Sequence, residues 1–225
     1  MKIIKTLITF TFLGMFFAHG LHAQKGSLNI GASFLWNKAR IADPILYEDN
    51  NPLFGFSTMV KLEFEPLKNL RVSYGIGNIV KGYTSSVTFR GSDGVYESVK
   101  VENKLTYLTN QLAVGWTIGS KFRIIPEIGF SFDVLINQEK TIGAFENLEE
   151  QKINTPEYFA DLSACVFGGV SFRYPLFNRM DLGVLAKYSQ GLNEITPKGS
   201  LVPEGKPSNF LVGAEIVWHL KKDKE

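Results

Sequence analysis

The sequence is poor in the residues that build disulfides, metal centres and histidine-based active sites. Its 225 residues include one cysteine, Cys165, and three histidines, of which only His219 lies outside the N-terminal segment. A lone cysteine excludes an internal disulfide framework and leaves few ligand sets for a metal. A serine hydrolase needs a base beside its nucleophile, and we interpret His219 as a hydrogen-bonding residue at a strand end instead. We therefore expect no enzymatic activity, no cofactor and no metal.

An excess of charge of one sign is also lacking. The formal net charge is +2, and residues 1–23 carry two lysines and no acid, so residues 24–225 are close to neutral. Nucleic-acid binding requires a basic patch, and we expect no nucleic-acid partner. A chain of about 200 residues fits a single domain.

The chain has one long apolar run, Leu7–Phe17, which follows Lys2 and Lys5 and precedes small residues. The run is shorter than the roughly 20 residues of a membrane-spanning helix. This layout predicts a secretory signal peptide over residues 1–23, cleaved after Ala23 or, as a second choice, after Gly20. A buried N-terminal helix or a retained anchor is the alternative. The exported domain is then expected to comprise residues 24–225.

The rest of the sequence alternates with a period of two. In the segment 122–137 every even position is apolar, whereas odd positions include Arg123, Glu127 and Asp133. Such alternation is typical of strands, and no helical period competes with it convincingly. We expect strands over 27–37, 54–65, 70–89, 96–118, 122–137, 158–174, 180–191 and 208–221.

Two folds accommodate such strands. A soluble sandwich turns the apolar face to a core, whereas a membrane barrel turns it to lipid and its polar face to a lumen. The connections decide between them, because long segments (38–53, 138–157, 192–207) and a long hairpin with its tip at 91–94 alternate with short turns (66–69, 119–121, 175–179). This sorting favours an all-β, eight-stranded, antiparallel up-and-down transmembrane β-barrel with short periplasmic turns and long external loops.

Aromatic residues follow the same sorting. Amphipathic rings settle at the two surfaces of a bilayer. We predict membrane-interface positions for Trp36 and Phe54 near the long loops, and for Trp116, Phe122, Tyr174 and Trp218 near the short turns. The expected surroundings are outer-membrane lipid.

Five stretches carry a resemblance to a known family: KGYTSS (81–86), YLTNQLAVGWTIG (107–119), IIPEIGFSFDVLIN (124–137), VLAKYSQGLNEI (184–195) and NFLVGAEIVWHLKK (209–222). Together they resemble the PorT-like outer-membrane β-barrel family of Gram-negative bacteria, over nearly the whole chain after residue 23. The resemblance implies a small barrel in the outer membrane. The family's namesake is linked to secretion and surface export, a role that the resemblance does not by itself carry to this chain.

Two residues depart from the expected barrel pattern. Asn110 falls on a lipid-facing position, where the family usually has an apolar residue, so we expect a bulge or a rim position there. Pro126 lacks a ladder donor, and we expect a local bulge around it.

Charged residues of both signs fall on the inward-facing positions of the predicted strands. An eight-stranded barrel is just wide enough to be filled by side chains, and an unpaired buried charge is costly. We therefore predict a salt-bridged plug, with a narrow ion or solute path as the alternative. The predicted lumen residues are Lys61, Glu63, Arg123, Glu127, Asp133, Asp161, Arg173, Lys187 and Glu215.

The external segments are the remaining candidate for a functional surface. Residues 84–104 remain strand-like beyond the membrane band, and such a hairpin offers an edge to which a protein partner can add a strand. Together with the acidic loop 145–151 it suggests adhesion or partner binding, against the alternative of a passive wall protein. A third hypothesis is a subunit of a secretion machine that makes its contacts through the periplasmic turns.

Overall fold

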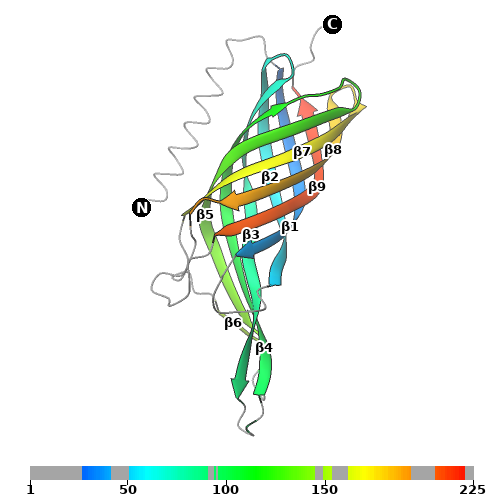
Figure 1. Ribbon diagram of the computed structural model, residues 1–225. Coiled ribbons are helices and arrows are strands. Elements are labelled where there is room, and N and C mark those ends of the chain that lie inside the picture. Colours follow the sequence, from blue (N-terminus) through cyan, green and yellow to red (C-terminus); the bar gives the residue numbers. More distant parts are fainter. Residues whose placement is uncertain are drawn as a thin grey trace.

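The computed structural model describes residues 27–41, 51–90, 94, 96–144, 149–153, 162–193 and 206–220. Its strands are β1 (Ser27–Ile41), β2 (Asn51–Leu67), β3 (Leu70–Arg90), β4 (Tyr96–Trp116), β5 (Arg123–Ile142), β6 (Gln151–Ile153), β7 (Leu162–Phe177), β8 (Met180–Gly191) and β9 (Pro207–His219). They pair antiparallel in the order β4-β3-β2-β1-β9-β8-β7-β5, and β4 also pairs with β5. This pairing closes eight strands into a barrel (Figure 1).

The predicted fold class is confirmed, and the alternative of a sandwich is wrong because the sheet closes on itself. All eight predicted strands are present, with ends that differ by a few residues. The short strand β6 was not predicted, since its three residues are all exposed and carry no alternation. The predicted signal peptide lies outside the described residues. Within those residues, no helix has the length and apolar character needed to cross a membrane.

The two faces of the sheet have opposite chemistry. In β1, Phe34 and Trp36 are 55% and 45% exposed, whereas Leu35 and Asn37 between them are buried. In β8, Leu182 is exposed while Asp181 is buried. Successive side chains of a strand point to opposite faces, so the strands place apolar side chains on the outside of the barrel and polar ones inside. This arrangement is the reverse of a soluble protein.

One end of the barrel is built from short turns. Two-residue turns join β2 to β3 at Lys68–Asn69 and β7 to β8 at Asn178–Arg179. Asn69 adopts a φ of 69°, a left-handed conformation that asparagine tolerates in tight turns. Its carbonyl accepts a hydrogen bond of 2.7 Å from the amide of Thr117, in the segment between β4 and β5. A backbone hydrogen bond therefore fixes the β2–β3 turn to the β4–β5 connection.

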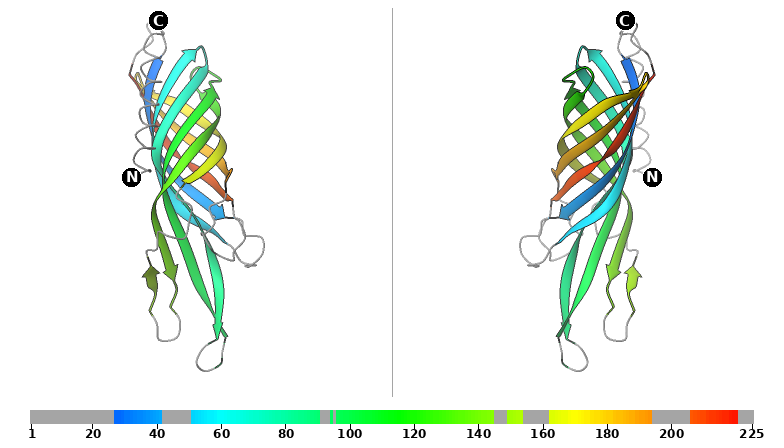
Figure 2. Two further views of the ribbon diagram at one scale, coloured as in Figure 1. Left: turned by 90° about the vertical axis from the view of Figure 1, so that its left-hand side faces the viewer. Right: turned by 90° about the vertical axis from the view of Figure 1, so that its right-hand side faces the viewer.

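At the other end the sheet continues past the barrel. The pairing of β2 with β3 ends at Asn51 and Thr84, whereas β3 and β4 stay paired as far as Arg90 and Tyr96. Strand β5 also continues, to Ile142, and pairs there with β6. Two hairpins consequently project from this end (Figure 2). We call residues 84–104, 138–142 and 151–153 the projecting sheet.

The prediction of a bulge at Pro126 is wrong. Gly115 pairs with Glu127, and Ile118 pairs with Ile124 in the same register, so no residue is inserted between them. Pairing with β7 is likewise continuous through Pro126. The missing proline donor falls on the side of β4, beyond the last continuous pair of that ladder. The proline is therefore accommodated where the ladder is already ending.

The prediction of a bulge or a rim position at Asn110 is also wrong. Asn110 lies in an uninterrupted register with Ile76 and Phe132. Its side chain is 7% exposed, and its Oδ1 accepts a hydrogen bond of 2.9 Å from the hydroxyl of Tyr74. A partner on the neighbouring strand therefore satisfies this polar group on the outer face. The irregularity of the β4–β5 ladder lies instead at Thr106 and Tyr107, where Ile136 is an extra residue in β5.

Candidate functional site

An ion pair between β7 and β2 crosses the barrel interior. Arg173 Nη1 and Nη2 each lie 2.6 Å from a carboxylate oxygen of Glu63. Both side chains are buried. In the ring of eight strands, β2 and β7 are four steps apart in either direction, which places them on opposite walls. Arg173 and Glu63 therefore join the two walls across the interior.

Three further charges complete this cluster. Arg173 Nε donates to Glu215 Oε1 at 2.7 Å, and Lys61 Nζ lies 3.4 Å from Glu215 Oε2. Arg71 Nη1 donates to Glu63 at 2.9 Å. Buried charges are stable only when they are paired and hydrogen-bonded. Each carboxylate here contacts two or more cations. Glu65, 2.6 Å from Arg71, is the third carboxylate that balances the three cations.

A second ion pair links β8 to β5 and β4. Lys187 Nζ lies 3.0 Å from Glu127 and donates to Gln111 Oε1 at 2.9 Å. The same ammonium lies 4.1 Å from the centre of the Phe167 ring, a cation–π contact. Lys187 itself is only 2% exposed. Its charge is therefore held by an anion, an amide oxygen and an aromatic face.

A third ion pair surrounds Asp133. Lys81 Nζ lies 2.7 Å from Asp133 Oδ2 and donates to Ser163 at 2.9 Å. The Thr109 hydroxyl donates to Asp133 Oδ1 at 2.5 Å. The thiol of Cys165 lies 3.4 Å from Lys81 Nζ. The contacts of Lys81 and Asp133 thus come from β3, β4, β5 and β7, and they again connect different walls.

Beside the ion pairs lies an apolar cluster inside the barrel. Its members are buried side chains of β1, β3, β4, β8 and β9: Leu35, Ile79, Leu105, Tyr107, Leu185 and Leu211. Tyr107 also borders the third ion pair, because Lys81 Nζ lies 4.8 Å from the centre of its ring. The interior of the barrel is consequently occupied by side chains, as expected for eight strands.

At the short-turn end, a further group of polar side chains lies at the rim of the barrel interior. Asp181 is buried and pairs with Arg123, which is 16% exposed. His219 Nε2 lies 3.0 Å from Asp181, and His219 Nδ1 is hydrogen-bonded to Asn29 Oδ1 at 2.8 Å. His219 is therefore a hydrogen-bonding residue at the rim, with no serine among these contacts.

The structure places eight of the nine predicted lumen residues inside the barrel or at its rim, and Asp161 lies outside the described residues. Sequence reasoning missed Arg71, Lys81 and Asp181. Arg71 and Lys81 lie on the inward-facing side of β3, and Asp181 is the second residue of β8, just after a short turn. The alternation of β8 could have indicated Asp181. In β3, glycines and Ile79 interrupt the polar residues of the inward face, so the signal for Arg71 and Lys81 is weak.

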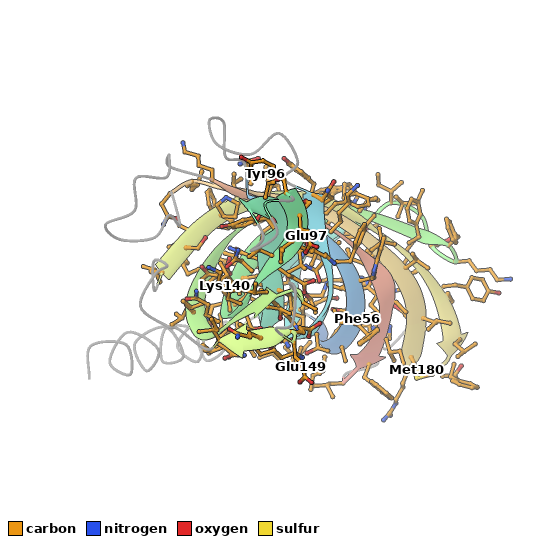
Figure 3. All side chains as sticks on the ribbon, turned by 90° about the horizontal axis from the view of Figure 1, so that it is seen from below. Phe56, Tyr96, Glu97, Lys140, Glu149 and Met180 are labelled. Carbon is orange, nitrogen blue, oxygen red and sulfur yellow. The ribbon has the colours of Figure 1, made fainter. Side chains whose placement is uncertain are left out.

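The six predicted interface aromatics all face outward. Seen from the projecting sheet, side chains point away from the ring of strands as well as into it (Figure 3). Trp36 and Phe54 stack with their ring centres 5.1 Å apart. The side chains of the six residues are between 45% and 54% exposed: Trp36, Phe54, Trp116, Phe122, Tyr174 and Trp218.

The described residues contain no group of three or more histidine, cysteine, aspartate or glutamate side chains that could hold a metal ion. What the interior groups do chemically is to pair with one another. The arrangement is suited to closing the barrel and to joining its walls.

Comparisons with known proteins found likenesses in structure only. The sequence matches no protein-family model, and no curated protein matches it. Neisserial surface protein A is 11% identical with a TM-score of 0.46, over 86% of this chain and 99% of that one. A major outer membrane protein from Thermus thermophilus is 13% identical with a TM-score of 0.48, over 87% and 100%. Ail, the attachment invasion locus protein of Yersinia pestis, is 11% identical with a TM-score of 0.40, over 87% and 100%. At these values the likenesses carry no argument about activity.

Proposed function

We propose that the protein is a small outer-membrane barrel, closed to solutes and without enzymatic activity, that binds a protein partner through its projecting sheet. Its outer face supports the membrane location, because large apolar side chains there, such as Ile128 at 64% and Phe130 at 56%, are exposed. A soluble protein rarely exposes a continuous apolar surface of this kind. The two groups of outward-facing aromatics fit the two surfaces of a bilayer.

The single observation that carries the closed state is the ion pair of Arg173 with Glu63. It spans opposite walls, and the pairs of Lys187 with Glu127 and of Lys81 with Asp133 add further links between strands. An ion passing through would have to separate these charges, and separating a buried pair costs several kcal/mol. The alternative, a narrow channel, finds no support in these contacts.

Conductance in planar bilayers tests this part of the proposal. We expect the purified protein to give no discrete current steps at any applied voltage. A porin added to the same bilayer afterwards serves as the control that the membrane accepts barrels. Reproducible unit currents from the protein alone would contradict the closed state and favour the channel.

The binding surface is proposed from the edge of β3. Its pairing with β2 stops at Thr84, whereas the strand runs on to Arg90, so among the described residues one edge of this segment has no partner strand. The outer-face residues Ser86 and Thr88 are exposed. An unpaired strand edge offers backbone donors and acceptors to an extended segment of another protein. This unpaired edge supports partner binding over the alternative of a passive wall protein.

Crosslinking in intact cells tests the binding surface. A photoreactive residue at Ser86 or Thr88 is expected to capture one neighbour in near-stoichiometric yield, and the same residue at Lys121 in a short turn serves as the matched control. Capture at neither end favours a passive wall protein. Capture of a protein at Lys121 alone would support the third hypothesis, a subunit of a secretion machine. The PorT-like resemblance is compatible with that role and stays a prediction.

A further inference from the structure

Among the described residues, the exposed charges at the short-turn end are all positive. Each of the three short connections exposes one cation: Lys68 between β2 and β3, Lys121 between β4 and β5, and Arg179 between β7 and β8. The described carboxylates at this end are buried or half-buried. Glu65 is half-buried and lies 2.6 Å from Arg71, and Asp181 is buried against Arg123.

The opposite end differs. There the described residues expose carboxylates and ammonium groups together, with Glu97, Glu149 and Glu150 alongside Lys100 and Lys152. Lys100 and Lys152 each lie within 4 Å of a glutamate, at 3.7 Å from Glu102 and 3.8 Å from Glu139. Within the part of the chain that the structure describes, only the short-turn end therefore presents positive charge without exposed negative charge beside it.

The three cations are spread around the rim. Their turns join β2 to β3, β4 to β5 and β7 to β8, which together occupy six of the eight places in the ring. A protein docked against one side of the barrel would reach one or two of them. A flat surface that surrounds the barrel reaches all three. The distribution therefore fits a lipid headgroup layer better than a single protein partner.

Aromatic side chains lie beside these cations. Lys121 Nζ is 5.9 Å from the centre of the Tyr174 ring, and Trp116 and Phe122 are exposed on either side of the same connection. Rings of this kind settle at headgroup level, and a lysine stem extends along apolar surface to bring its ammonium to the same depth. The turns are also held in place, since the amide of His219 donates to the carbonyl of Arg179 at 2.9 Å. The cations are thus presented at a defined level on a fixed rim.

We infer that the short-turn rim binds the phosphate groups of anionic phospholipids, through Lys68, Lys121 and Arg179, in the leaflet that the short turns face. This inference rests on the proposed membrane location. Cations near an anionic lipid surface each strengthen its attraction about fivefold. The rim would select anionic over zwitterionic lipid and would fix the barrel's depth in that leaflet.

Native mass spectrometry tests the inference on protein purified in a mild detergent. The probe is mixed micelles of phosphatidylcholine and phosphatidylglycerol at a three-to-one ratio, and the readout is the ratio of the two lipids retained on the folded barrel. The rim variant is Lys68→Gln, Lys121→Gln and Arg179→Gln together. The matched control, Lys100→Gln, Lys152→Gln and Lys206→Gln, removes the same charge from exposed positions at the other end.

We expect the unmodified protein and the control to enrich phosphatidylglycerol severalfold over the micelle ratio, and the rim variant to lose the enrichment. The inference is overturned if the unmodified protein retains the lipids at the micelle ratio, if the rim variant keeps its enrichment, or if the control loses as much. Heat-modifiable gel migration in phosphatidylcholine alone separates the two proposals. A barrel that folds in phosphatidylcholine but shows no lipid preference contradicts only this inference. A chain that never folds in lipid or detergent contradicts the membrane location as well.

Discussion

Arg173 and Glu63 face each other from opposite walls of the barrel and form two hydrogen bonds of 2.6 Å. They are 110 positions apart in the sequence, so their contact exists only when the barrel has closed. Glu63 and Glu215 both depend on the same guanidinium. The pair therefore joins opposite walls, and in the proposed closed state it also blocks the interior.

Removing the guanidinium should cost considerable stability. In Arg173→Met, two buried carboxylates lose their main cation, and breaking a buried pair from one side costs about 3–5 kcal/mol. We expect a correspondingly lower free energy of unfolding, measured by urea titration in lipid vesicles. The control is Lys152→Met, whose side chain is 64% exposed and pairs with Glu139 at 3.8 Å. A loss of less than about 1 kcal/mol, the scale of an exposed pair, in Arg173→Met would contradict the described pairing.

The thiol of Cys165 should be unreactive in the folded barrel. It is 2% exposed and lies inside the barrel beside Lys81 and Asp133. A water-soluble maleimide is expected to label it only after urea unfolding. The control protein carries Cys165→Ser with Ser98→Cys, which places the thiol on an exposed position of the projecting sheet and should react at once. Equal labelling rates for the two folded proteins would mean that water-filled space reaches the interior.

A charge on the outer face should be tolerated only near the rim. Ile128 lies within the outward-facing apolar run of β5 and is 64% exposed, whereas Ile118 lies in the connection before that strand and is 53% exposed. A lysine on the lipid face costs about 2–4 kcal/mol at mid-membrane and about 0–1 kcal/mol near the interface. Ile128→Lys should therefore destabilise the barrel in vesicles much more than Ile118→Lys. Similar costs for both variants would argue against a lipid band around β5.

The outward-facing pair of Tyr74 and Asn110 should behave as a unit. Tyr74→Phe removes the donor and leaves the Asn110 carbonyl oxygen without this bond, at a cost of about 1–3 kcal/mol for a buried unsatisfied group. Adding Asn110→Leu removes the orphaned group and should recover most of that stability. Urea unfolding of the single and double variants in vesicles measures both effects. Additive losses in the double variant would show that the two side chains act independently.

Much of the fold could be predicted because barrel strands carry a local signal. The segment 122–137 alternates at nearly every position, and β5 begins one residue later, at Arg123. The sorting of long and short connections then indicated closure into a barrel. Local signals fail where a strand is short and exposed, as for β6, or where a polar residue on the outer face finds a partner on the next strand, as Asn110 does with Tyr74.

The interior was harder to predict than the strands. Parity alone marks Glu63, Arg173 and Glu215 as inward-facing, but which of them meet depends on the register of every ladder between β2 and β7. A shift of one residue in one ladder would have changed the partners. In β3 the polar residues are sparse and separated by glycines and Ile79, so the inward parity of Arg71 and Lys81 was not evident from the sequence.

The most direct test of an apolar exterior around a charged interior is gel migration of the protein extracted from the membrane fraction, with and without boiling. A closed barrel keeps its structure in detergent, so the unboiled protein should migrate at a different apparent mass from the boiled protein and should be recovered with outer membranes. Recovery in the soluble periplasmic fraction, with one and the same migration before and after boiling, would contradict it.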